Sequence, residues 1–111
     1  MTAEEAVVVF VTSPSVEAGQ TMARALVAER LAACVNVVPG VRSVFFWEGR
    51  VQEEVEALLV IKTRREGYAA VERRVLELHP YSVPEVLALP VDTGSAAYLA
   101  WVGETVRRQG G

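Results

Sequence analysis

Cysteine is almost absent from this sequence of 111 residues, and no long apolar segment is present. A single cysteine, Cys34, cannot form a disulfide within the chain, which is typical of proteins from a reducing compartment. The first residues, Met1 to Glu5, lack the basic start of a signal peptide. No apolar run approaches the roughly 20 residues that a membrane-spanning helix needs. We therefore expect a soluble, cytoplasmic protein without a membrane partner.

Clustered positive charge is missing as well. The chain has 11 Lys and Arg against 14 Asp and Glu, a formal net charge of −3, and its basic residues are scattered. Nucleic-acid-binding proteins depend on stripes of Lys and Arg that neutralise phosphates. This balance argues against that class, so we expect no nucleic-acid partner.

The composition is otherwise that of a globular protein, 51% apolar and 23% charged, in a length that suits one domain over residues 1–111. A chain this short buries only about two-thirds of its unfolded surface. Association with further copies would therefore add stability.

Strands and helices are predicted to alternate along the chain. Apolar, β-branched runs predict strands over residues 6–11, 34–47, 50–63 and 83–91. Apolar stripes at helical spacing predict helices from the Ser13–Ser15 cap to about Arg30, over residues 66–78, and from Gly94–Ser95 to Arg107–Arg108, with Gly110 and Gly111 frayed. Pro39–Gly40 indicates a bulge, bend or edge, and Glu48–Gly49 a short hairpin turn.

The element order is β-α-β-β-α-β-α, and its first six elements match the split βαβ plan. We predict an α+β fold, a ferredoxin-like sandwich with a long central hairpin and an extra C-terminal helix. Both predicted helices then cover one sheet face. Leu58 and Val60 point away from Leu59 and Ile61, so apolar side chains lie on both faces of the hairpin. Covering four such side chains would contribute roughly 1.5–3 kcal/mol each, which favours a partner subunit on the second face.

Five segments resemble the CutA family in register over nearly the whole chain. They are ERLAACVNVVPGV (residues 29–41), FWEGR (46–50), LVIKT (59–63), ELHPYSVPEV (77–86) and YLAW (98–101). The resemblance implies a ferredoxin-like fold and a homotrimer in which long hairpins extend the sheets between subunits. It also implies a role in tolerance of copper or another divalent metal, and an assembly similar to that of PII-like signalling proteins. Some family members carry a Cys where this chain has Val11 and a second His where it has Leu78, so only His79 remains of that metal-binding set.

His79 is the candidate metal ligand, through a neutral imidazole. The alternative is a helix-end residue that interacts with the last carbonyls or with a neighbouring subunit. Cys34 is either a metal thiolate or reactive nucleophile, or a small buried core residue, which its apolar neighbours favour. A Cys34–His79 catalytic pair lacks any local signature of such an enzyme, and we expect no enzymatic activity.

Charged residues form two further candidate groups. Glu53, Glu54 and Glu56, with Glu48 nearby, are carboxylates that can hold hard cations or act in acid–base catalysis. A solvated strand face that discourages edge pairing explains them more simply, with Arg42 or Arg50 as partners across a subunit boundary. Lys62, Arg64 and Arg65 form either an anion pocket or ordinary surface charge.

Large aromatic residues complete the candidates. Trp47, Tyr81, Tyr98 and Trp101 are side chains of the kind that interface cores favour, and Trp47 lies where one subunit has little core of its own. We interpret Cys34, Trp47, Lys62, Tyr81 and Glu85 as candidates for an intersubunit cleft or interface. The leading hypothesis is a homotrimeric metal-tolerance protein without catalysis. The alternative is a PII-like sensor that binds a small molecule or nucleotide between subunits.

Overall fold

The computed structural model describes residues 1–108 and contains four strands and three α-helices in that range. The strands are β1 (Ala6–Ser13), β2 (Cys34–Trp47), β3 (Arg50–Arg64) and β4 (Val86–Pro90). The helices are α1 (Val16–Ala28), α2 (Tyr68–Leu78) and α3 (Ala96–Thr105). Short 3₁₀ turns at Ala3–Glu5 and Arg65–Gly67 precede β1 and α2.

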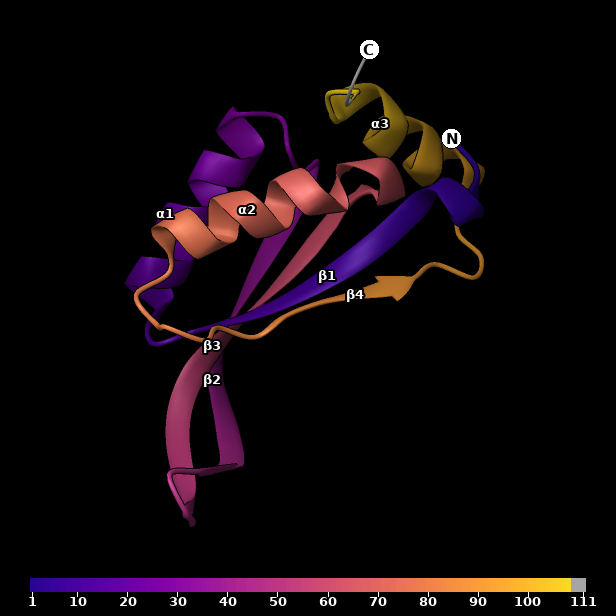
Figure 1. The fold of residues 1–111 in the computed structure, drawn as a ribbon. Coiled ribbons are helices and arrows are strands. Elements are labelled where there is room, and N and C mark those ends of the chain that lie inside the picture. The colour runs from indigo at the N-terminus through magenta and orange to yellow at the C-terminus, as the bar shows by residue number, and fades with distance from the viewer. Residues whose placement is uncertain (109–111) are drawn as a thin grey trace.

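One antiparallel sheet of order β2-β3-β1-β4 organises the chain. Helices α1 and α2 lie side by side on one face of it, and α3 lies at one end (Figure 1). The predicted ferredoxin-like α+β fold with an extra C-terminal helix is confirmed. Within residues 1–108, none of the helices is both long and apolar enough to cross a membrane.

The core lies between this sheet face and the two helices. Alternation along β1 and β3 sends every second side chain towards the helices. The result is a cluster of buried residues, Val7, Val9, Val11, Met22, Leu26, Ala32, Leu59, Ile61, Val71 and Val75. Gly19 shows how closely α1 approaches, because a methyl group there would come within 3.0 Å of a Leu59 side-chain carbon.

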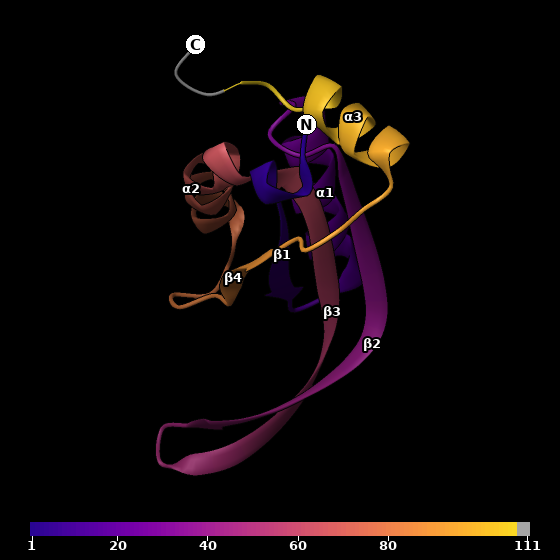
Figure 2. The ribbon, with the colours of Figure 1, turned by 90° about the vertical axis from the view of Figure 1, so that its right-hand side faces the viewer.

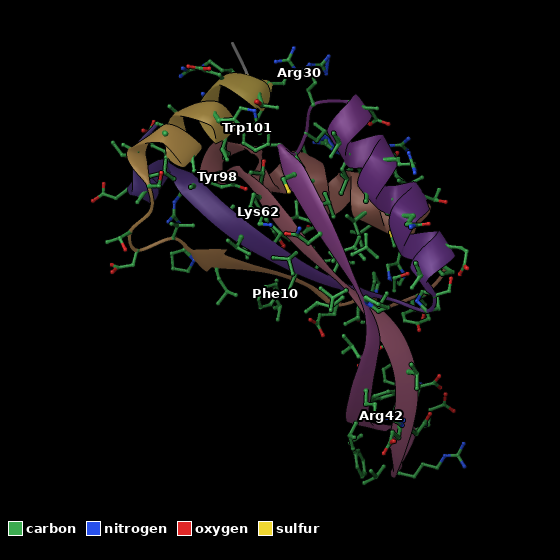
Figure 3. The ribbon with its side chains drawn as sticks, turned by 180° about the vertical axis from the view of Figure 1, so that it is seen from behind. Phe10, Arg30, Arg42, Lys62, Tyr98 and Trp101 are labelled. Atoms are coloured by element: carbon green, nitrogen blue, oxygen red, sulfur yellow. The ribbon has the colours of Figure 1, made fainter. Side chains whose placement is uncertain are left out.

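The opposite face of the sheet carries apolar residues that no helix covers fully. Strand register places Phe10 between Val60 and Leu87, and Val8 next to Leu89. We call this surface the open face and define it by Val8, Phe10, Leu58, Val60, Leu87 and Leu89. Leu87 is 58% and Leu89 44% exposed. Figure 3 looks onto this face, with Phe10 and Lys62 on it and Tyr98 and Trp101 of α3 at its upper end. The prediction that apolar side chains occupy both sheet faces is confirmed.

The outer half of the β2–β3 hairpin is an arm that leaves the core and curls (Figure 2). The register shifts between Val38 and Val41, so Pro39–Gly40 is a bulge, and Gly40 has a φ of +73° that glycine adopts without strain. Glu48 and Gly49 both have positive φ, as a two-residue hairpin turn of type I′ requires. The arm makes the molecule elongated, 43 Å against 26 and 22 Å.

Several predicted boundaries were wrong, including the end of β1, which extends to Ser13 instead of Val11. Helix α2 starts at Tyr68, since residues 65–67 form a 3₁₀ turn. The last strand starts at Val86 rather than at residue 83, because residues 83–85 around Pro84 form a loop that does not pair with β1. Helix α3 ends at Thr105, so Arg107 and Arg108 lie beyond it. The expected fraying of Gly110 and Gly111 lies outside the described residues.

A different arginine caps the end of α3. Arg30 donates from Nε to the Thr105 carbonyl at 2.9 Å and from Nη2 to the Glu104 carbonyl at 3.2 Å. These carbonyls have no partner inside the helix, and a cation at this end also interacts favourably with the helix dipole. Arg30 thereby joins the turn after α1 to α3 (Figure 3).

Candidate functional site

A cavity of about 780 Å³ lies between the curled arm and the loop of residues 81–85 that precedes β4. We call it the hairpin–loop cleft. Its aromatic lining residues are Phe45, Trp47 and Tyr81, and its acidic ones are Glu48, Glu54, Glu56 and Glu85. None of the described residues that line it is Lys, Arg or His. The volume is within the usual range for small-molecule sites.

Tyr81 connects the loop to the arm. Its hydroxyl donates to Glu56 Oε2 at 3.0 Å, and its ring lies 4.7 Å from that of His79, centre to centre. Glu56 is only 8% exposed. Burial, followed by the hydrogen bond to Glu56, raises the pKa of Tyr81 to about 12. The hydroxyl therefore keeps its proton, and its role as donor, throughout the physiological range.

His79 lies under this loop at the C-terminal cap of α2 and is 7% exposed. The Tyr81 backbone N–H donates to Nδ1 at 3.1 Å, so Nδ1 acts as acceptor. Nε2 therefore carries the proton and donates to the Thr12 carbonyl at 2.6 Å. Both ring nitrogens are engaged within the chain, and a metal ion at either one would have to displace a hydrogen bond.

Cys34 and Lys62 form a separate cluster near α3. They are direct cross-strand partners, with Lys62 Nζ 3.9 Å from Cys34 Sγ and also hydrogen-bonded to Asn36 Oδ1. Tyr98 covers this cluster; its pKa is raised by burial first and then by the neighbouring Cys34. Lys62 is six positions along β3 from Glu56, which corresponds to about 20 Å of strand. The structure therefore brings Trp47, Tyr81 and Glu85 together in the hairpin–loop cleft and leaves Cys34 and Lys62 apart from them.

This separation bears on metal binding. A strong transition-metal site needs three or four converging ligands. Residues 1–108 contain no group of three or more His, Cys, Asp or Glu close enough to hold an ion. The donor set of a single chain therefore does not fit a resident copper ion.

The anion pocket was one of two interpretations of Lys62, Arg64 and Arg65, and a single chain does not assemble it, since the three cations diverge. Lys62 lies on the sheet face, whereas the nearly buried Arg64 donates from Nη2 to the Gly103 carbonyl at 2.5 Å. Arg65 donates from Nε to the Glu4 carbonyl at 2.8 Å. Both arginines thus stabilise the packing of neighbouring segments.

The acidic cluster also differs from the prediction. Glu53 pairs with Arg42 of the same chain at 3.5 Å, and both side chains are largely exposed. Glu56 was expected on a solvated face, but the 81–85 loop covers it. Strand parity could show that Glu54 and Glu56 share a side; it could not show that a loop 25 residues later folds over one of them. Phe45 and Thr12 also line the cleft, and no motif in the sequence pointed to them.

All three tyrosines have raised pKa values, which gives a pH-dependent prediction. Burial, followed by the hydrogen bond to Glu72, raises the pKa of Tyr68 to about 12. The pKa of Tyr81 is also raised to about 12, and that of Tyr98 is raised in the same direction. A raised pKa means that the folded state holds the proton more tightly than the unfolded state. The tyrosine contribution to stability is therefore fully present below pH 10 and is lost as the pH rises from 10 through about 12.

Ultraviolet titration of tyrosinate measures this directly. Between pH 10 and about 12 the folded protein should show much less tyrosinate than the same chain in urea, and its unfolding midpoint should fall across that interval. Tyr81→Phe should remove about one-third of the tyrosine signal. Coincident titration curves for folded and unfolded protein would contradict the assignment.

The chain is similar in sequence to divalent-cation tolerance proteins. The family model described as CutA1 divalent ion tolerance protein matches residues 7–105. The Thermus thermophilus divalent-cation tolerance protein CutA is 50% identical over 97 residues, which are 87% of this chain and 94% of that protein. The chloroplastic protein CutA 1 of Oryza sativa is 48% identical over 101 residues, 91% of this chain; this chain spans 57% of the rice protein.

A solved structure agrees with the sequence comparison. The crystal structure of CutA1 from Oryza sativa superposes with a TM-score of 0.92 at 47% identity, covering 95% of this chain and 96% of that one. The long hairpin and the extra C-terminal helix thus occur in a fold that is shared over almost the full length.

Proposed function

This chain belongs to the CutA1 divalent ion tolerance family, and we propose that it functions in divalent-cation tolerance as a cytoplasmic homotrimer that catalyses no reaction. The observation that carries the assembly is the open face, where apolar side chains of β1, β3 and β4 lie partly or largely exposed in a single chain. Apolar surface of this extent is characteristic of an interface. Three copies related by a threefold axis would cover it with one repeated contact.

Copper is the first candidate cation, and the positions of His79 and Cys34 limit how it would bind. His79 uses both ring nitrogens within the chain, and Cys34 lies far along the sheet from it. A copper site built on His79 would need that ring to leave Thr12 and further ligands from another copy. We therefore propose that tolerance does not depend on a chelate formed by His79 and Cys34.

Copper calorimetry on the wild type and on His79→Ala tests this, with the mass measured by light scattering in the same samples. We expect a mass of about 36 kDa, three times that of the 12.1 kDa chain, for both proteins. We also expect no saturable copper binding that disappears with His79. A monomeric mass would refute the assembly, whereas copper binding lost with His79→Ala would refute the metal argument alone.

A second candidate function is a sensor that binds a small molecule, and the hairpin–loop cleft favours it. A cavity of about 780 Å³ with three aromatic walls has the size and lining of a ligand site. The PII-like version of this function takes a nucleotide as ligand. Adding ATP to the same calorimetric series separates this version from a sensor for another ligand class.

A further inference from the structure

We propose that the hairpin–loop cleft binds an organic cation, an ammonium or guanidinium group on an apolar stem, with Glu56 as its counter-ion and Phe45 and Trp47 as its walls. The proposal rests on the sensor function above and specifies its ligand class. The proposed ligand is positively charged, whereas the nucleotide of the PII-like version is negatively charged.

Glu56 is the central observation. The residue as a whole is only 8% exposed, yet its carboxylate forms no ion pair with any described residue. The Tyr81 hydroxyl donates to Oε2, while Oε1 receives no hydrogen bond from residues 1–108 and is not enclosed by them. A carboxylate can accept about four hydrogen bonds and is costly to bury without a cation. Glu56 lines the cleft, so a cation bound there can pair with its carboxylate.

The rest of the lining repels anions. Glu48, Glu54 and Glu85 add three further carboxylates, and no described lining residue is basic. A nucleotide would have to place its phosphates against these groups without a balancing Lys or Arg. The charge of the cleft therefore selects a cation.

The lining also favours an organic cation over a bare metal ion. No three acidic, His or Cys groups of the described chain converge on one point, as a metal ion requires. In a single chain Phe45 is 37% and Trp47 46% exposed, so one chain by itself leaves their rings open to a ligand. A positively charged nitrogen over such a ring gains a cation–π interaction, and an apolar stem gains contact area.

The same chemistry has two possible sources. One is a free amine, and the other is the Lys or Arg side chain of a second copy reaching into the cleft. The first predicts that an added amine binds to the assembled protein. The second predicts that the assembly itself weakens when the Glu56 charge is removed.

Calorimetry with benzylamine on the full-length protein tests the first source. Benzyl alcohol and benzoate are the matched neutral and anionic probes, which need no substitution and so remain informative if a variant fails to fold. We expect saturable binding of benzylamine at one site per chain and none of the other two. Glu56→Gln should weaken binding at least about tenfold, and Trp47→Leu several-fold. Glu104→Gln, which removes the same charge from an exposed position on α3, should leave it unchanged.

Light scattering on the same samples tests the second source. If benzylamine does not bind to the wild type, a cation from a second copy predicts that Glu56→Gln lowers the mass at dilution while Glu104→Gln does not. Absence of both effects would overturn the proposal, as would benzylamine binding that survives Glu56→Gln or is matched by benzyl alcohol. The cleft lies within one chain, so a monomeric wild type that still binds benzylamine would refute the trimer and not the cation site.

Discussion

Leu59→Ala is expected to lower the free energy of unfolding by about 3–5 kcal/mol, a large part of the total stability of a domain of this size. Leu59 is fully buried at the centre of the sheet, between its cross-strand partners Val11 and Val37. It also contacts α1 at Gly19, where an added Cβ would lie 3.0 Å from a Leu59 side-chain carbon. Truncation would therefore leave a cavity enclosed by three elements that cannot collapse into it without breaking strand register.

Urea unfolding at a fixed chain concentration measures this loss, with Leu76→Ala as the matched control. Leu76 is 50% exposed on α2, so the same three carbons are removed from a position that packs little, and we expect a change within about 0.5 kcal/mol. A fixed concentration is needed because association of copies adds to the apparent stability. Equal losses of unfolding free energy in the two variants would mean that Leu59 does not contribute to the packing between the sheet and α1 as its burial indicates.

The contrast between Leu59 and its neighbour Leu58 also shows what could be predicted from the sequence. The run from Ala57 to Ile61 is apolar at both parities, and alternation alone requires it to contact both sides of the sheet. The bulge at Pro39–Gly40 and the turn at Glu48–Gly49 were predictable for a similar reason. Proline and glycine restrict or extend the backbone angles locally, whatever the rest of the chain does.

The hairpin–loop cleft was less predictable, because it depends on contacts between distant segments. Tyr81 meets Glu56 only because the arm curls after the bulge and because residues 83–85 do not join the last strand. Neither event has a local signature. The cap on α3 is another example, since Arg30 is 75 positions from the carbonyl that it binds. Arg107 and Arg108 were the local candidates for that role, and the helix ends before them.

The metal prediction rested on His79 alone, because a sequence gives residue types and spacing but not distances in space. His79 and Cys34 are the only His and Cys of the chain, so a copper site with imidazole or thiolate ligands would have to use them. The fold places one at the end of α2 and the other at the start of β2. The strands of the sheet therefore hold His79 and Cys34 apart. Ligand identity in the sequence therefore says little until the topology gives the distance.

Val60→Glu is expected to convert the proposed trimer into a folded monomer. Val60 lies in the middle of the open face, between Phe10 on β1 and Asn36 on β2. In a single chain this position is only partly covered, so the new carboxylate can reach water and the core on the other face remains intact. In the assembly the same position would be enclosed, and each copy would bury an unpaired charge at a cost of several kcal/mol.

Light scattering should then give a mass near that of the 12.1 kDa chain, with an unchanged circular dichroism spectrum. Val27→Glu is the control, since Val27 is 39% exposed on α1, away from the open face, and should keep the trimer mass. If Val60→Glu remained trimeric while Val27→Glu dissociated, the copies would meet through the helical layer and not through the sheet. Threefold symmetry makes this test sensitive, because one substitution alters every copy of the repeated contact at once.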